Sequence, residues 1–314
     1  MSELTIPESW NGFPAYPYSK EFIDHILTSL EGRTDAERRE WLAMAMARVA
    51  FQRSNFLPNI KRFTELSGKR VLEIGCGTGP TSVVMAQEGA TIQARDIDPF
   101  MVKAAQLRVR DHGVGDRVTV RLVEDSAKLD APDASYDVVV ANGVFEHIQP
   151  EIRAEILREI WRVLAPGGCV FIGETPNRLF PYDEHTTGLW GLHYLPAPLA
   201  IRYAKWRHRI GPKDDLHAMG GLGCTYWELL HALPDGQVDV LNMHRENSWA
   251  RRKAAACSKS PAGRAKALVY RTLGFVETAF VKPVLRMPID GLMPYLTLGL
   301  IKTLPLQDFV DFIP

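Results

Sequence analysis

A regular alternation of strand-like and helix-like segments, running from residue 69 to residue 177, constrains the fold more than any other feature of the sequence. Apolar, strand-like segments occur at 69–75, 91–97, 117–125, 136–142 and 168–177, and helical patterns occur at 81–89, 99–113 and 152–168. This rhythm is typical of a parallel sheet covered by helices. We therefore predict an α/β core, in which the crossover between residues 125 and 136 is left unassigned.

The segments on either side of this core are less regular. Residues 1–20, rich in Pro, Trp and Tyr, predict an extended arm, and residues 19–63 predict two or three helices, one of them capped by Thr34. Beyond residue 177 we expect a helix starting near Thr225 and strands at 236–242 and 295–303. The predicted divisions are 1–63 (N-terminal arm and helices, forming a lid), 64–177 (core), 178–235 (a lid insertion) and 236–314 (the end of the core with a basic helical insertion).

The bulk composition excludes several classes of protein. The 314 residues carry 37 basic and 37 acidic side chains, and this balance argues against a dedicated nucleic-acid-binding protein. None of the four cysteines lies in a C-x-x-C pair, so neither a disulfide framework nor a structural zinc site is predicted. The N-terminal residues lack the pattern of a signal peptide, and the longest apolar run, 292–301, has about half the length that spans a bilayer. We expect a buried strand there and a cytoplasmic protein.

A glycine-rich turn follows the first core strand in the sequence "VLEIGCGTGP". Gly75, Gly77 and Gly79 allow the backbone to come close to a ligand, and Asp96, at the end of the next strand, is placed to hold ribose hydroxyls. The dinucleotide fingerprint is G-x-G-x-x-G, whereas the spacing here is G-x-G-x-G. Glu73 would repel a pyrophosphate but suits a cationic ligand group. The turn therefore favours a nucleoside ligand that carries positive charge.

Five motifs in order, each on its proper strand end, resemble those of the class I S-adenosylmethionine (SAM)-dependent methyltransferases. They are "VLEIGCGTG", "ARDIDPFMVKAAQ", "VEDSAKL", "YDVVVANGVFEHI" and "VLAPGGCVFIG". The resemblance implies a Rossmann-like, seven-stranded, mostly parallel sheet flanked by helices, with N-terminal helices and helical or loop insertions after the fifth strand and between the sixth and seventh strands. It also implies SAM as the cofactor.

The resemblance also implies residue roles. Asp96 would bind the ribose hydroxyls, Ile97 would lie against adenine, Asp125 would accept from the adenine amino group and Ser126 would offer its backbone N–H. Asn142 and Gly143 would line the methionine end. The implied cofactor-binding set is Glu73, Gly75, Cys76, Gly77, Gly79, Asp96, Ile97, Asp125, Ser126, Asn142 and Gly143.

Methyl transfer to a hydroxyl requires a general base as well as positioning, and histidine is the usual candidate. His147 follows Glu146 directly after the fourth core strand. Some quinone-pathway members of the family have E-x-x-E-H here and hold a metal, but this chain has Gly143 at the first glutamate position, so we predict no metal. A structural role for His147, packed at a helix start, is the alternative.

Two further candidate bases, His185 and His193, lie in the segment "PYDEHTTGLWGLHYLP" after the fifth core strand. Loops at this position commonly carry function, and we expect this one to overhang the acceptor site. The alternative is a structural lid whose histidines are satisfied internally. Of the three histidines, His193 and His185 are the preferred bases from the sequence.

Basic residues gather in the C-terminal half: Arg202, Lys205, Arg207, Arg209, Lys213, Arg245, Arg251, Arg252, Lys253, Lys259, Arg264, Lys266 and Arg271. Such a stretch is either a solvated face or a surface that attracts an anionic acceptor or a membrane. The segment after the fourth core strand reads "ANGVF" rather than N/D-P-P-Y/F, which disfavours methylation of nucleobase amino groups. We predict methyl transfer to a small-molecule, glycan or lipid acceptor, with a hydroxyl oxygen as the default. An RNA methyltransferase and a C- or N-methyltransferase on a natural-product intermediate are the alternatives.

Overall fold

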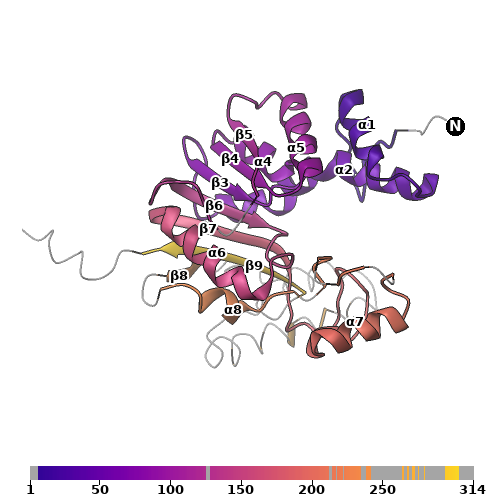
Figure 1. Cartoon of the computed structure of the whole chain (residues 1–314). Helices are drawn as coiled ribbons and strands as arrows, with labels where there is room; N and C mark the ends of the chain where they lie inside the picture. The colour runs from indigo at the N-terminus through magenta and orange to yellow at the C-terminus, as the bar shows by residue number, and fades with distance from the viewer. Residues whose placement is uncertain are drawn as a thin grey trace, which may run out of the picture. The chain divides into compact units, whose positions relative to one another are not determined.

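The computed structural model describes residues 6–124, 128–211, 214–216, 218–221, 223–234, 238–241 and 294–303, together with a few positions between 264 and 279 (Figure 1). The strands are β1 (Ser9–Trp10), β2 (Phe13–Pro14), β3 (Arg70–Ile74), β4 (Thr91–Asp96), β5 (Val118–Leu122), β6 (Tyr136–Asn142), β7 (Leu164–Pro176), β8 (Val238–Leu241) and β9 (Tyr295–Lys302). The helices are α1 (Lys20–Thr28), α2 (Asp35–Asn55), α3 (Leu57–Lys61), α4 (Pro80–Gln87), α5 (Pro99–Asp111), α6 (Pro150–Val163), α7 (Ala197–Trp206) and α8 (Tyr226–Leu230), and a short 3₁₀ turn spans Leu192–Tyr194.

Seven strands form one sheet in the order β5-β4-β3-β6-β7-β9-β8. Strand β3 pairs in parallel with β4 on one side and with β6 on the other, and β4 pairs in parallel with β5. The predicted seven-stranded, mostly parallel sheet is therefore confirmed. Because the strands β3 to β6 are parallel, their carboxyl ends meet at one edge of the sheet, which is where such sheets bind ligands.

The chain divides into two compact units. The first contains residues 1–142, 159–171 and 301–314, and the second contains residues 143–158 and 172–300. In the first unit, α4 and α5 pack against β4 and β5, and α1 and α2 pack in turn against α5 and α4 (Figure 1). The centres of β3 and β6 are fully buried, as expected for parallel strands covered on both faces.

Local sequence signals explain where the helices start. The Thr34 side chain accepts from the backbone N–H of Glu37, whose carboxylate accepts in return from the Thr34 N–H at 2.9 Å, so the predicted cap is confirmed. Asp98 caps α5 through the Phe100 N–H, and Pro99 begins that helix with the φ it already prefers. A second capping box, made by Thr225 and Glu228, begins α8.

Three features differ from the sequence-based expectation. Strand β7 begins at Leu164, earlier than predicted, because Pro166 disfavours helix for the residue before it. The N-terminal arm holds a β1–β2 hairpin whose two-residue turn, Asn11–Gly12, has positive φ at both positions; the Asn-Gly pair was the available signal. Helix α7 was also not predicted, since its buried residues, Ala200 and Ala204, give little apolar period.

No helix in the described part of the chain is both long enough and apolar enough to cross a membrane. The apolar run at residues 292–301 was predicted to be a buried strand. Its described part contributes β9, in which Leu296, Leu298 and Leu300 are buried, so that prediction is confirmed.

Candidate active site

The glycine turn connects β3 to α4 at the carboxyl edge of the sheet. Gly75, Gly77 and Gly79 all have positive φ, and Gly79 is the residue from which α4 starts. A side chain at Gly79 would also meet Ala105 of α5 at 3.0 Å, whereas a side chain at Gly77 would meet no atom within 4 Å. Gly79 therefore lets helix α5 pack closely, and Gly77 leaves open space over the turn, where backbone can face a ligand.

Asp96, the last residue of β4, holds this turn from the neighbouring strand. Its Oδ2 accepts from the Gly77 N–H at 2.7 Å, and its Oδ1 accepts from the Asp98 N–H at 3.0 Å. Each oxygen keeps a lone pair for a further donor such as a ribose hydroxyl. Ile97 follows directly and is 62% exposed, which is unusual for its size and suits a residue that covers a flat ring.

Glu73 lies beneath the turn and is buried. Burial, together with the nearby Asp96 carboxylate, raises the pKa of Glu73 to about 8, although the Ser82 hydroxyl donates a hydrogen bond to it. The carboxyl group is therefore largely protonated at neutral pH, and a cationic ligand group beside it would favour the ionised form. The adjacent Cys76 is also buried, and burial raises the pKa of its thiol well above the usual range.

Asn142 ends β6 at the same edge of the sheet. Its side-chain Oδ1 is buried and has no hydrogen-bond partner. A buried acceptor without a donor is costly unless a ligand supplies one. The open space at Gly77, the spare lone pairs of Asp96 and the orphaned oxygen of Asn142 thus fit SAM, which carries ribose hydroxyls and an amino group. Asp125 and Ser126 lie outside the described residues.

The second unit contains Gly143, Glu146 and His147. Gly143 has φ +70 and donates its N–H to the Gly173 carbonyl at 2.8 Å. Glu146 is buried, accepts from the Thr175 hydroxyl at 3.1 Å, and has a pKa raised to about 7 by burial. The exposed His147 ring places Nδ1 2.8 Å from the Ala218 carbonyl oxygen and Nε2 3.9 Å from Glu146 Oε1. Because a carbonyl can only accept, Nδ1 carries a proton, and in the neutral form of the ring the lone pair is then on Nε2.

His185 lies beside this pair. Its ring centroid is 6.3 Å from that of His147 and 6.4 Å from that of Tyr295. Desolvation and the neighbouring His147 lower the pKa of His185, and burial raises the pKa of Tyr295 to about 12. A side chain at Gly220 would lie 2.8 Å from Glu146 and 3.2 Å from both histidines. We define Glu146, His147, His185, Gly220 and Tyr295 as the histidine cluster. Gly220 and Tyr295 were not predicted from the sequence, since no motif marks them.

His193 occupies a different environment. Its side chain is buried, its Nδ1 lies 3.1 Å from the Phe180 carbonyl oxygen, and its Nε2 lies 3.9 Å from Asp183 Oδ1. Asp183 is itself engaged with the Thr187 N–H and hydroxyl at 2.8 and 2.7 Å and the Thr186 N–H at 3.0 Å. His193 therefore packs with the carboxylate that fixes its own loop, whereas the other two predicted bases share a cluster.

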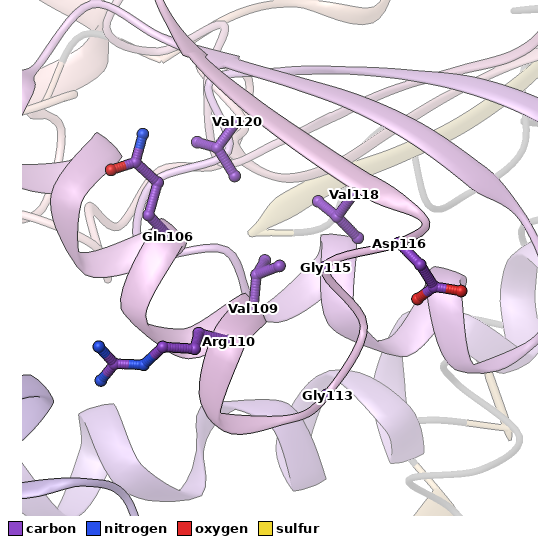
Figure 2. Close-up of a pocket in the computed structure, with 8 residues that line it drawn as sticks. All are labelled: Gln106, Val109, Arg110, Gly113, Gly115, Asp116, Val118 and Val120. Carbon is purple, nitrogen blue, oxygen red and sulfur yellow. The ribbon is translucent and has the colours of Figure 1, made fainter.

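A shallow groove of about 680 Å³ lies between α5 and the edge strand β5, with Val109, Arg110, Asp116 and Val118 in its lining (Figure 2). The residues from Gly113 to Asp116 precede β5, whereas the predicted cofactor-binding residues lie at or beyond the carboxyl ends of their strands. The groove is therefore separate from the cofactor site. Among the described residues, no group of three or more His, Cys, Asp or Glu side chains is arranged to hold a metal ion.

Comparisons with known proteins show what this chain is similar to. A methyltransferase domain matches residues 71–168. The ubiquinone biosynthesis O-methyltransferase of Xylella fastidiosa (strain 9a5c) is 33% identical over 187 residues, which cover 50% of this chain and 74% of that protein. The protein of the same name from Xanthomonas euvesicatoria pv. vesicatoria (strain 85-10) is 41% identical over 114 residues, or 36% of this chain and 46% of the relative. The match thus spans about half the length of the Xanthomonas relative.

Among solved structures, a SAM-dependent methyltransferase from Aquifex aeolicus is 22% identical, with a TM-score of 0.37, over 47% of this chain and 77% of that one. The fold is that of an α/β protein with a candidate nucleoside site at the carboxyl edge of a parallel sheet. The chain belongs to the class I SAM-dependent methyltransferases, whose cofactor is SAM. The predicted family and cofactor are confirmed.

Proposed function

We propose that this chain transfers the methyl group of SAM to a hydroxyl oxygen of a small-molecule acceptor. The observation that carries the proposal is the pair formed by Glu146 and His147, in which the imidazole Nε2 lies 3.9 Å from the carboxyl group. The names of the two relatives, both O-methyltransferases, support transfer to oxygen. SAM supplies an electrophilic methyl group, so the protein's own tasks are to position the acceptor and to remove its proton.

His147 is the base that the geometry favours. The Ala218 carbonyl oxygen fixes the proton on Nδ1, which leaves Nε2 to accept a proton from the acceptor. The Glu146 carboxylate would then stabilise the imidazolium that forms. His193, preferred from the sequence, has its ring buried in the packing of its own loop. The roles of all three histidines stay predictions.

The chemistry of this base limits the acceptor. A phenolic hydroxyl ionises near pH 10, whereas an aliphatic alcohol ionises several units higher. A base that works near neutral pH transfers a proton efficiently only when the two pKa values are not far apart. We therefore propose an acidic hydroxyl, such as that of a phenol, as the acceptor group.

A transfer assay tests this function. Purified protein with SAM and a panel of phenols, catechols and aliphatic alcohols should give methyl ethers of the phenolic compounds, measured by mass spectrometry. His147→Gln should lower turnover at saturating SAM by about a hundredfold, the usual contribution of a general base. His193→Gln is the matched control and should leave more activity. A His147→Gln variant that stays within tenfold of the wild type would contradict the base assignment.

We also propose the cofactor contacts that the first unit supports: Asp96 to the ribose hydroxyls, Ile97 against adenine, and Asn142 Oδ1 accepting from the methionine amino group. The supporting observations are the two backbone bonds of Asp96, the exposure of Ile97 and the unpartnered Asn142 oxygen. The predicted roles of Asp125 and Ser126 rest on the sequence resemblance. We further propose that the enzyme acts in the cytoplasm, as the sequence analysis predicted.

A contact with an anionic surface is the proposed partner interaction. Most of the basic C-terminal region lies outside the described residues, but α7 belongs to its described part. Ala200 and Ala204 lie on the buried face of α7. The side chains of Leu199 and Trp206 are 52% and 69% exposed. The bases of this segment are Arg202, Lys205, Arg207 and Arg209, and residues 197–211 include no acidic side chain. Exposed aromatic and aliphatic groups among bases are typical of helices that lie on anionic membranes.

A further inference from the structure

Arg108 on α5 is a fully buried arginine whose partners are neutral oxygens. Its Nε donates to the Thr78 carbonyl at 2.7 Å, and its Nη2 donates to the Thr78 hydroxyl at 3.1 Å and to the Ala45 carbonyl at 3.0 Å. Its Nη1 donates to the Tyr18 hydroxyl. Its Cζ lies 5.0 Å and 4.8 Å from the ring centroids of Tyr18 and Phe22.

These contacts join parts of the first unit that are far apart in sequence. Tyr18 belongs to the arm before α1, Ala45 belongs to α2, and Thr78 lies inside the glycine turn, between Gly77 and Gly79. A buried guanidinium is expensive unless its donors are satisfied, and here the planar fork matches the carbonyl and hydroxyl of a single turn residue. An apolar side chain would fill this space at lower cost but could not hold the turn.

We propose that Arg108 is a positioning residue for SAM binding, which fixes the glycine turn by tying it to the N-terminal arm and α2. The N-terminal arm then contributes to cofactor affinity through Arg108. The proposal concerns the binding of SAM alone, so it is tested without a methyl acceptor. Its outcome does not depend on which acceptor the enzyme uses.

The test measures SAM binding by titration calorimetry for Arg108→Lys. Lysine keeps the charge but cannot form the fork to Thr78 while also reaching Tyr18 and Ala45. Loss of two or more of these bonds should weaken SAM binding by about tenfold or more, at roughly two- to tenfold per bond. Hydrogen exchange of the peptide containing residues 75–79 should become faster in the ligand-free variant, at a temperature where the protein remains folded.

Arg110→Ala is the matched control. Arg110 lies on the same helix and also reaches the N-terminal segment, through Glu21 at 2.6 Å and the Ser19 hydroxyl at 2.9 Å, but at the surface. Its loss should leave SAM affinity and turn exchange within twofold of the wild type. Equal losses in both variants would show that docking of the N-terminal segment, rather than Arg108, controls the turn, and would overturn the proposal. Unchanged affinity in a folded Arg108→Lys variant would overturn it as well.

Tyr18→Phe provides the second test in case Arg108→Lys fails to fold. The ring and its packing remain, and the lost hydroxyl is the group that accepts from Arg108 and also lies 2.9 Å from His112 Nε2. A weakening of SAM binding by about two- to fivefold, with faster exchange of the turn, supports the proposal. Wild-type affinity and wild-type turn exchange in this variant overturn it.

Discussion

At the scale of single residues, the Asp96 carboxylate holds the glycine turn in addition to its proposed role in binding the ribose. Its two oxygens already hold the Gly77 and Asp98 N–H groups. Removing it therefore loosens the turn as well as removing the proposed ribose contact. The resemblance to a family predicts the second role, whereas the first is visible only in the geometry.

Asp96→Ala should weaken SAM binding by roughly 1–3 kcal/mol, the range for hydrogen bonds that involve a charged group. Asp96→Asn should give a smaller loss than Asp96→Ala, because its single amide oxygen can still accept from one of the two N–H groups, although its NH2 group would face the other. Titration calorimetry of both variants measures the two losses. Wild-type affinity in Asp96→Ala would rule out the ribose assignment.

The raised pKa of Glu146 predicts how the reaction rate depends on pH. Burial raises its pKa to about 7, so the carboxylate that would stabilise protonated His147 forms only as the pH rises through about 7. The ratio kcat/KM of the wild type should therefore increase as the pH rises through about 7. Glu146→Gln keeps an acceptor for the Thr175 hydroxyl but should lower the rate and flatten this part of the profile. A variant that keeps the wild-type profile would exclude Glu146 from the proton transfer.

At the scale of elements, the parts of the fold that could be predicted are those whose signals are local. Pro99 and the Thr34 cap mark helix starts, and the continuous apolar runs of β3 and β6 mark buried parallel strands. Helix α7 was missed because its buried face consists of two alanines, Ala200 and Ala204, which give almost no periodic apolar signal.

The candidate site divides in the same way. The turn glycines and Asp96 belong to two motifs, each at the end of a predicted strand, so their place at the sheet edge could be predicted. The environments of the histidines depend on backbone from distant segments, such as the Ala218 carbonyl oxygen beside His147. No spacing in the sequence indicates which histidine nitrogen keeps a lone pair or that the His193 ring is buried.

Helix α7 gives a prediction of its own. The protein should sediment with vesicles that contain about a third anionic lipid and should not sediment with neutral vesicles, with binding weakened by salt. Trp206→Ala and the pair Arg207→Gln/Arg209→Gln should each reduce sedimentation several-fold. Trp41→Ala, another exposed tryptophan but on α2, is the control. Equal binding to neutral vesicles, or binding to RNA instead of lipid, would contradict the assignment.

At the scale of the whole molecule, a net charge of zero conceals an uneven distribution of charge and of buried titratable groups. Among the residues that the structure describes, each of the two compact units buries a carboxyl group with a raised pKa, Glu73 in the first and Glu146 in the second. Both occur at candidate functional positions. Burial of these carboxyl groups therefore lowers the free energy of unfolding at neutral pH.

Glu73 should make the ligand-free protein less stable as the pH rises from 6.5 to 8. Its pKa is about 8 in the folded state and near 4.5 when unfolded, so its contribution is complete below 4.5 and is lost as the pH rises through 8. The slope is up to about 1.4 kcal/mol per pH unit for one carboxyl group. His112, whose pKa burial lowers to about 4, changes stability only below pH 6.5.

Chemical denaturation of the wild type and Glu73→Gln at several pH values measures this effect. The difference between the two proteins isolates Glu73, because Glu146 titrates in both. The variant should lose most of the decline between pH 6.5 and 8. Parallel curves for the two proteins would show that Glu73 is ionised in the folded state.

Because Gly220 has no side chain, a substitution at this position could help to identify the methyl acceptor. Gly220 has φ +79, and a single added methyl group would press against Glu146, His147 and His185. The proposed SAM contacts lie on other residues. We therefore expect the Gly220→Ala variant to bind SAM and its acceptor but to transfer the methyl group slowly. Such a variant could serve as bait, retaining from a cell extract the small molecule that the active enzyme would convert and release.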